Sequence, residues 1–386
     1  MKRFVVFGIL LLIMLIAPKS ALAYLGLCCS KCGGNMPMNI PGGGVPETHE
    51  FRFKLSPMFM SMDGLLDGST DLNEESLLGM PSMGKFMAVQ TEMDMYMVNV
   101  AAGYSFTDDL FGGIMLMWRK NDMDMKFNSN MKTTTGQDGF TMKSSGMGDT
   151  MLMGKYRLYT DDPLIPASQF SLFFGVSLPT GSINEKNSNH PLSMRKGEQL
   201  PYSMQLGSGT FDPTFGLLYQ GSSSPLWWGA NLTYTGRWYE NSRDYRLGDE
   251  YRYDLYGMYQ FRYDTLVQLQ INGKYQGEIK GEMDEFRTGL SGRSTQGDPS
   301  SPLMTPLWNA ENYGGHKISV TAGLQWQPFP LHILDLSVGV PIFQHLNGPQ
   351  LEEDYRVIFT WYVELPTSSS IRYTGKDDRG GSRLGF

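Results

Sequence analysis

Methionine recurs at every second position in one short stretch, and this spacing is the first sign of chemistry in the sequence. Residues 91–100 read TEMDMYMVNV, in which single residues separate Met93, Met95 and Met97. A period of two places these side chains on one face of a β-strand. Thioether sulfur is a soft ligand that favours Cu(I) over magnesium or calcium. The stretch therefore predicts a strand with one soft, metal-binding face.

Three more segments carry methionine with the same spacing, and in each of them the methionines share a face with charged residues. The opposite face holds large apolar residues, among them Leu55 and Trp118. If the apolar faces meet lipid, the sulfur atoms point into the interior of a barrel. The four segments are consecutive predicted strands, so their inner faces adjoin and form one patch. The patch comprises Met58, Met60, Met62, Met93, Met95, Met97, Met115, Met117, Met123, Met125, Met151 and Met153.

Two interpretations of this patch are open. The thioethers could hold a soft transition metal such as copper, as Cu(I). They could also fill a narrow lumen or offer an adaptable surface to apolar solutes, because methionine is flexible and polarizable. The chain contains 27 methionines. Their concentration in the first strands is harder to explain by filling alone, since leucine would fill the space equally well.

A second sulfur-rich segment, CCSKCGGNMPMN, lies near the N-terminus. Its candidate metal ligands are Cys28, Cys29, Cys32, Met36 and Met38. The C-x-x-C spacing within it suits a soft metal or a redox-active disulfide, and a plain disulfide would leave one thiol over. Metal and disulfide both stay open. Because a Pro/Gly-rich stretch follows, residues 24–47 are predicted to form a periplasmic tether or a small plug.

Residues 1–23 are predicted to be a signal peptide. Lys2 and Arg3 precede the apolar run 4–17, and Ala21-Leu22-Ala23 provides a small-residue cleavage site. Export places the rest of the chain outside the cytoplasm. No later apolar run is long enough for a membrane-spanning helix, so insertion into a membrane requires a closed β-barrel.

The rest of the chain alternates apolar and polar residues in runs of about ten, separated alternately by short turns and long polar loops. This pattern predicts an all-β fold, a transmembrane antiparallel up-and-down β-barrel of about 12 strands over residues 48–365. Both termini lie in the periplasm, and 366–386 form a polar tail. The predicted strands are 49–62, 86–106, 111–126, 147–160, 169–181, 209–221, 226–240, 250–263, 266–281, 316–328, 333–346 and 355–365.

Five segments resemble a known family. They are SGMGDTMLMGKYRLY (145–159), FSLFFGVSLPTGSINEK (170–186), LPYSMQLGSGTFDPTFGLLY (200–219), YRLGDEYRYDLYG (245–257) and LNGPQLEEDYRVIFTWYVEL (346–365). The sequence is similar to the bacterial outer-membrane β-barrel transporter family named after the meta-pathway of phenol degradation. The resemblance implies an outer-membrane barrel with a transport role, and it defines the cargo poorly.

The predicted function is an outer-membrane channel or transporter whose methionine-lined lumen handles a soft metal such as copper. One alternative is a channel for small hydrophobic or aromatic solutes, and another is a structural or metal-binding surface barrel with a closed lumen. The partners expected are outer-membrane lipid, a metal ion or small solute, and a periplasmic metal carrier. A net charge of −7 disfavours nucleic acid. No catalytic motif accompanies the five histidines, so no enzyme activity is predicted; they are His49, His190, His316, His332 and His345.

Overall fold

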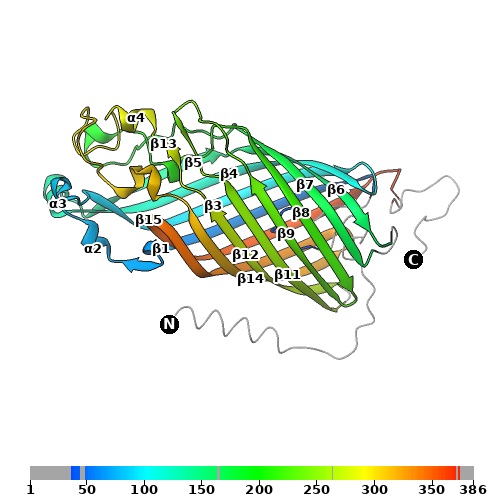
Figure 1. The fold of residues 1–386 in the computed structure, drawn as a ribbon. Coiled ribbons are helices and arrows are strands. Elements are labelled where there is room, and N and C mark those ends of the chain that lie inside the picture. Colours follow the sequence, from blue (N-terminus) through cyan, green and yellow to red (C-terminus); the bar gives the residue numbers. More distant parts are fainter. Residues whose placement is uncertain (1–35, 44–47, 163–165, 263, 371–372, 374–386) are drawn as a thin grey trace.

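The computed structural model describes residues 36–43, 48–162, 166–262, 264–370 and 373, which build a closed antiparallel β-barrel (Figure 1). Ten of the barrel strands follow one another around the wall in chain order. They are β1 (Glu50–Gly68), β3 (Ala88–Ser105), β4 (Leu110–Phe127), β6 (Thr150–Thr160), β7 (Ser168–Leu178), β8 (Asp212–Ser223), β9 (Leu226–Thr235), β11 (Glu250–Arg262), β12 (Thr265–Gln276) and β14 (Gly315–Phe329).

The element β15 (His332–Pro366) supplies two further strands and closes the barrel. Its first arm pairs with β14 from His332 to Leu346, and its second arm returns along β1 from Leu346 to Pro366. Gly348 lies between the arms with a φ of 67°, a conformation that favours glycine. Ten single strands and two arms make twelve barrel strands in the described part of the chain. The predicted fold class is confirmed.

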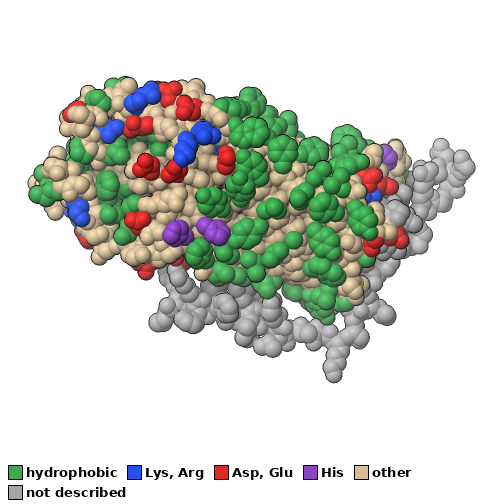
Figure 2. All heavy atoms as spheres, in the orientation of Figure 1, with side chains coloured by type: hydrophobic (Ala, Val, Ile, Leu, Met, Phe, Trp, Pro, Cys, Tyr) green, Lys and Arg blue, Asp and Glu red, His purple; other side chains and the backbone are tan. Residues whose placement is uncertain are grey.

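The outside of the barrel is apolar and its inside is polar. In β11 the side chains of Tyr251, Leu255 and Tyr259 are exposed, whereas Asp254 and Gln260 on the other face are buried. An apolar band covers the visible outer wall, and charged side chains gather toward its two ends (Figure 2). Such a band matches the lipid-facing surface of outer-membrane barrels. The chain is therefore a membrane-spanning barrel of the outer-membrane type.

The two ends of the barrel differ in the length of their connections. At one end the strands are joined by short turns such as 106–109 and 330–331. The first and last barrel strands also meet there, where the Thr367 N–H donates to the His49 carbonyl over 3.3 Å. These features mark the periplasmic end of such barrels. The predicted signal peptide, the three cysteines and residues 374–386 of the predicted tail lie outside the described residues.

Long connections at the opposite, external end fold together into a cap, defined here as residues 69–87, 128–138, 148–149, 179–211, 236–249 and 277–314. No helix in the described chain is long and apolar enough to cross a membrane. The sequence predicts polar loops in this region, whereas the structure adds β5, which pairs with residues 118–126 of β4. The short elements are β2 (Thr70–Leu72), α2 (Glu74–Leu77), α3 (Ser129–Thr135), β5 (Gly139–Met147), β10 (Tyr245–Arg246), β13 (Lys280–Gly281), α4 (Asp284–Arg287) and the 3-10 turns Pro81–Met83, Ser193–Arg195, Tyr202–Met204, Pro306–Trp308 and Ala310–Asn312.

Candidate functional site

A row of directly opposite methionines crosses four neighbouring strands on the inner face of the barrel. Met142 of β5 lies opposite Met123 of β4, and Met123 lies opposite Met93 of β3. Met93 in turn lies opposite Met62 of β1. Side chains directly opposite one another on adjacent strands are in reach of each other. These four residues are called the thioether half of the row.

The same row continues into charged residues on the other side of β1. Met62 lies opposite Glu353, whose backbone N–H and C=O are each held at 3.0 Å by the side chain of Gln344. Gln344 lies opposite Lys317 of β14. Lys317 in turn lies opposite Lys274 of β12, and Lys274 lies opposite Arg252 of β11. The ionic half of the row is Glu353, Gln344, Lys317, Lys274 and Arg252.

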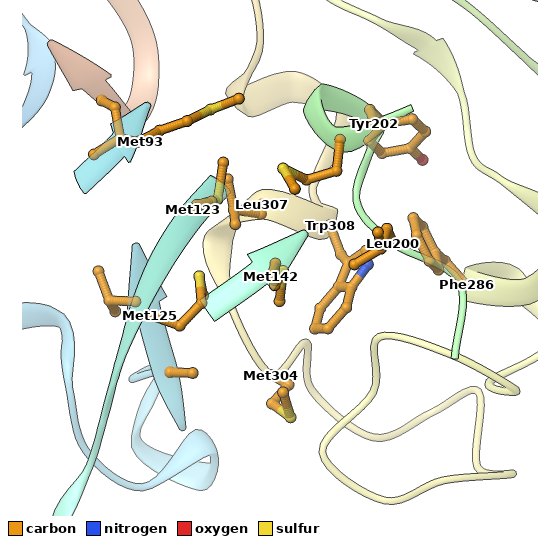
Figure 3. Packing of buried hydrophobic residues seen from close by; sticks show 14 of the residues in the cluster. Met93, Met123, Met125, Met142, Leu200, Tyr202, Phe286, Met304, Leu307 and Trp308 are labelled. Carbon is orange, nitrogen blue, oxygen red and sulfur yellow. The ribbon is translucent and has the colours of Figure 1, made fainter. Parts of the chain in front are cut away.

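The thioether half is buried under the cap. The exposed fractions of Met93, Met123 and Met142 are 3%, 1% and 0%. Their side chains pack in one apolar cluster with residues that the cap loops bring over the barrel (Figure 3). The cap residues of this cluster include Leu200, Tyr202, Phe286, Met304, Leu307 and Trp308. Sulfur at this end of the row is therefore part of a hydrophobic core.

The cations of the ionic half stay accessible although they lie on the inner face. The side chains of Arg252, Lys274 and Lys317 keep 50%, 40% and 27% of their surface exposed. Glu250 contacts both Arg252 and Lys274, the latter over 3.0 Å. Exposed cations on an inward face mark a part of the lumen that water reaches. The water-accessible part of the lumen near its external end thus lies along β11, β12 and β14.

The other predicted metal-binding methionines lie on the same inner wall, outside the row. Met60 lies opposite Met95 and Met58 opposite Met97, and all four are partly exposed. The remaining positions are Met115 opposite Met151, Met117 opposite Asn99, Met125 opposite Phe140, and Met153, whose sulfur accepts from Arg52 Nη2 over 3.9 Å. These methionines outside the row, on β1, β3, β4 and β6, are called the thioether wall; they are Met58, Met60, Met95, Met97, Met115, Met117, Met151 and Met153, together with Met125 beside Phe140. Metal binding by the wall stays a prediction.

Residues 36–43 lie inside the barrel toward its periplasmic end. Asn39 and Gln270 exchange two side-chain hydrogen bonds of 3.1 and 2.8 Å, and Arg52 donates to the Gly43 carbonyl over 2.9 Å. Met36 and Met38 are fully buried in a second cluster, apart from the thioether wall. Their partners there include Trp227, Tyr256, Met258, Leu266, Ile333 and Tyr362. The predicted ligands Cys28, Cys29 and Cys32 lie outside the described residues.

The histidines of the external end are scattered. His190 is buried in the cap with its ring centroid 4.6 Å from that of Phe140, and burial lowers its pKa to about 4. His316 lies opposite His345 on the outer face, where its Nε2 is 3.0 Å from the Tyr253 hydroxyl. The described residues hold no group of three or more His, Cys, Asp or Glu that could bind a metal.

Sequence reasoning missed the ionic half as a site. The alternation in 266–274 and 316–326 places Lys274 and Lys317 on the polar face, but it gives them no more significance than other polar residues there. The available signal was that Lys274, Lys317 and Arg252 all occupy inward-facing positions, on strands that pair with one another. Recognising it requires the register between strands, which a single sequence does not supply.

Comparisons with known proteins agree with this architecture. The family model described as "Putative MetA-pathway of phenol degradation" matches residues 89–297. No curated protein matches the sequence. The COG4313 outer membrane channel from Pseudomonas putida F1 has a TM-score of 0.52 at 11% identity, with 86% of this chain and 99% of that chain covered. The Pseudomonas putida toluene transporter TodX has a TM-score of 0.42 at 9% identity, with coverage of 89% and 98%.

Proposed function

This chain belongs to the family described as "Putative MetA-pathway of phenol degradation", and from that premise we propose that it is an outer-membrane channel for small hydrophobic or aromatic solutes. The observation that carries the proposal is the thioether wall. Partly exposed methionines there present apolar surface to the lumen beside polar groups. Flexible, polarizable side chains adapt to apolar solutes of different shape.

Passage through this barrel is expected to be selective rather than open. The cap covers the thioether half of the row, and residues 36–43 occupy part of the lumen near the periplasmic end. A solute entering along β11, β12 and β14 would pass the thioether wall before it met the N-terminal segment. Its exit would require that segment to shift, because Met36, Met38 and Ile40 are buried in the cluster with Trp227, Tyr256 and Tyr362.

Uptake into vesicles tests the proposal. Full-length protein in lipid vesicles should admit phenol faster than protein-free vesicles do. The double substitution Met60→Gln and Met97→Gln should slow phenol uptake several-fold, because glutamine has a similar length and presents an amide in place of the thioether. Met83→Gln is the matched control, since Met83 is exposed on the cap. Equal uptake with and without the protein would overturn the proposed function.

A second candidate function is the binding or passage of a soft metal, favoured by the alignment of Met62, Met93, Met123 and Met142. Thioether ligands at adjacent positions suit Cu(I). The burial of three of the four in an apolar core argues for packing as their main role. Cu(I) titration of the purified protein decides between these roles. Substituting Met93 and Met123 by leucine should abolish binding if the row holds metal, and unchanged affinity would rule this site out.

A further inference from the structure

The ionic half of the row has the chemistry of an anion site. Arg252, Lys274 and Lys317 lie directly opposite one another on three adjacent strands. Like charges in this arrangement destabilise a sheet unless an anion lies near them. The carboxylates of Glu250 and Glu353 supply part of that compensation. Further charged groups facing the cluster are Asp254, Arg356, Glu352 and Arg237.

The three cations keep donors available after these contacts are made. Arg252 uses its Nε on Glu250, and its two terminal nitrogens have no hydrogen-bond partner among the described residues. Lys317 Nζ is 3.9 Å from Glu353 Oε2 and makes no hydrogen bond to the described part of the protein. Lys274 Nζ contacts Glu250 at 3.0 Å. A guanidinium edge beside two ammonium groups matches the geometry and charge of a carboxylate.

The two arms of β15 lie between the anion site and the thioether wall. Glu353 lies opposite Met62, and Arg356 lies opposite Met60 on the same pair of strands. Arg356 Nη1 contacts Glu353 at 3.1 Å, so these two side chains form the border between cations and sulfur. Lys317 is thus separated from the methionines of β1 by the two arms of β15, which carry Gln344 and Glu353. The inner face of the barrel therefore changes from ionic to apolar between β14 and β1.

We propose that Arg252, Lys274 and Lys317 bind the carboxylate of a small aromatic acid near the external end of the lumen, before its ring reaches the thioether wall. This inference rests on the proposed function and narrows its substrate class to amphipathic organic acids. The inward position of the cations, their exposure and their free donors carry the argument. The site lies near the external end of the barrel, so it would select the solute before the solute passes deeper into the lumen.

The test compares benzoate with phenol, which share a ring and differ in charge at neutral pH. Benzoate binding to the full-length protein in detergent is measured by calorimetry, and uptake of both solutes is measured in vesicles. The double substitution Lys274→Gln and Lys317→Gln should weaken benzoate binding about tenfold or more, because it removes two charge-assisted contacts. Phenol uptake should stay unchanged. Lys143→Gln, on the exposed face of β5, is the control for loss of positive charge.

The outcomes separate this inference from the proposed function. Absent phenol uptake by the wild-type protein would contradict the proposed function, and benzoate calorimetry would still test the anion site. Benzoate affinity that is unchanged by the double substitution, or equally reduced by the control, would overturn the anion site. Arg252→Lys retains charge without the planar fork and should recover part of the affinity lost in Arg252→Gln. Heat-modifiable gel mobility establishes that each variant is folded.

Discussion

The two halves of the lumenal row share one face of one sheet and differ in what covers them. Met123 and Met142 are buried beneath the cap, whereas Lys274 and Arg252 lie at the same face and remain accessible. Both halves occupy inward-facing positions of their strands, so the alternation of side chains does not explain why one half is buried and the other accessible. The cap does, because its apolar residues pack over β3, β4 and β5. Which part of this inner face stays accessible thus follows from where the loops bury apolar surface.

The same comparison separates packing from binding. Methionine is suited to fill the irregular space between strands and loops, and burying it contributes to stability. Charged side chains would lose hydration under the same cap, and they remain where water reaches them. The thioether half is therefore expected to affect folding of the external end, and the ionic half to affect solute selection.

Exchanging the chemistry of the two halves should give the largest effect. Met123→Lys places a charge in a site without a partner, and the expected cost is about 3–5 kcal/mol. Lys274→Met makes the reverse exchange at an accessible position and should change stability by under about 1 kcal/mol. Urea unfolding in detergent, followed by heat-modifiable mobility, measures both. Comparable losses in the two variants would remove the distinction between the halves.

Cavity formation should come next in size. Met142→Ala removes most of a fully buried side chain from β5, and the expected loss is about 2–4 kcal/mol. The matched control is Met147→Ala at the exposed end of the same strand, with a change within about 0.5 kcal/mol. Urea unfolding of the external end, read by hydrogen exchange of cap amides, measures the difference. Similar protection in both variants would mean that the cap does not depend on the thioether half.

Much of the barrel could be predicted because its signal is local. In β12 the exposed Leu269 and Ile271 alternate with the buried Gln268 and Gln270, as the sequence indicates. Lipid outside and polar groups inside impose this period on each strand separately. Strand ends were less predictable. β1 extends to Gly68, beyond the predicted end at 62, because it continues to pair with β15 past the membrane.

The site could be predicted only in part, because its environment depends on contacts between distant segments. Alternation places Met93 and Met123 inside, but their burial depends on loops around Leu200 and Trp308 that have no periodicity. The contact between Asn39 and Gln270 joins residues 231 positions apart. Such contacts are set by loop packing in three dimensions. The spacing of the methionines therefore predicted which of them face inward, but it did not predict the loops that cover the thioether half of the row.

A smaller effect is expected from His190, which lies at the covered end of the barrel. Its Nδ1 accepts from the Leu192 N–H over 3.1 Å, and burial lowers its pKa from 6.5 to about 4. The unfolded cap takes up a proton near pH 6.5 and the folded cap does not. Cap stability should therefore fall as the pH drops from 6.5 toward 4, by about 3 kcal/mol in total, and should level off below that.

Hydrogen exchange of cap amides across this pH range measures the effect. His190→Phe should remove the dependence in this window while preserving ring packing against Phe127 and Phe140. Backbone amides around the ionic half serve as an internal reference, because their protection from hydrogen exchange should change less over this pH range. An unchanged pH profile in His190→Phe would assign the dependence to another group.

The smallest effect concerns the N-terminal segment, which occupies the lumen opposite the cap. Asn39→Ala removes both amide hydrogen bonds to Gln270, and the expected loss of segment docking is about 1 kcal/mol. Weaker docking should raise the frequency of conducting events in planar bilayers without changing unfolding of the barrel. Asn184→Ala is the control, because it alters an amide of the cap at the other end. If the segment limits passage, only Asn39→Ala raises the frequency. An equal rise in both variants would show that docking of the N-terminal segment does not by itself limit passage.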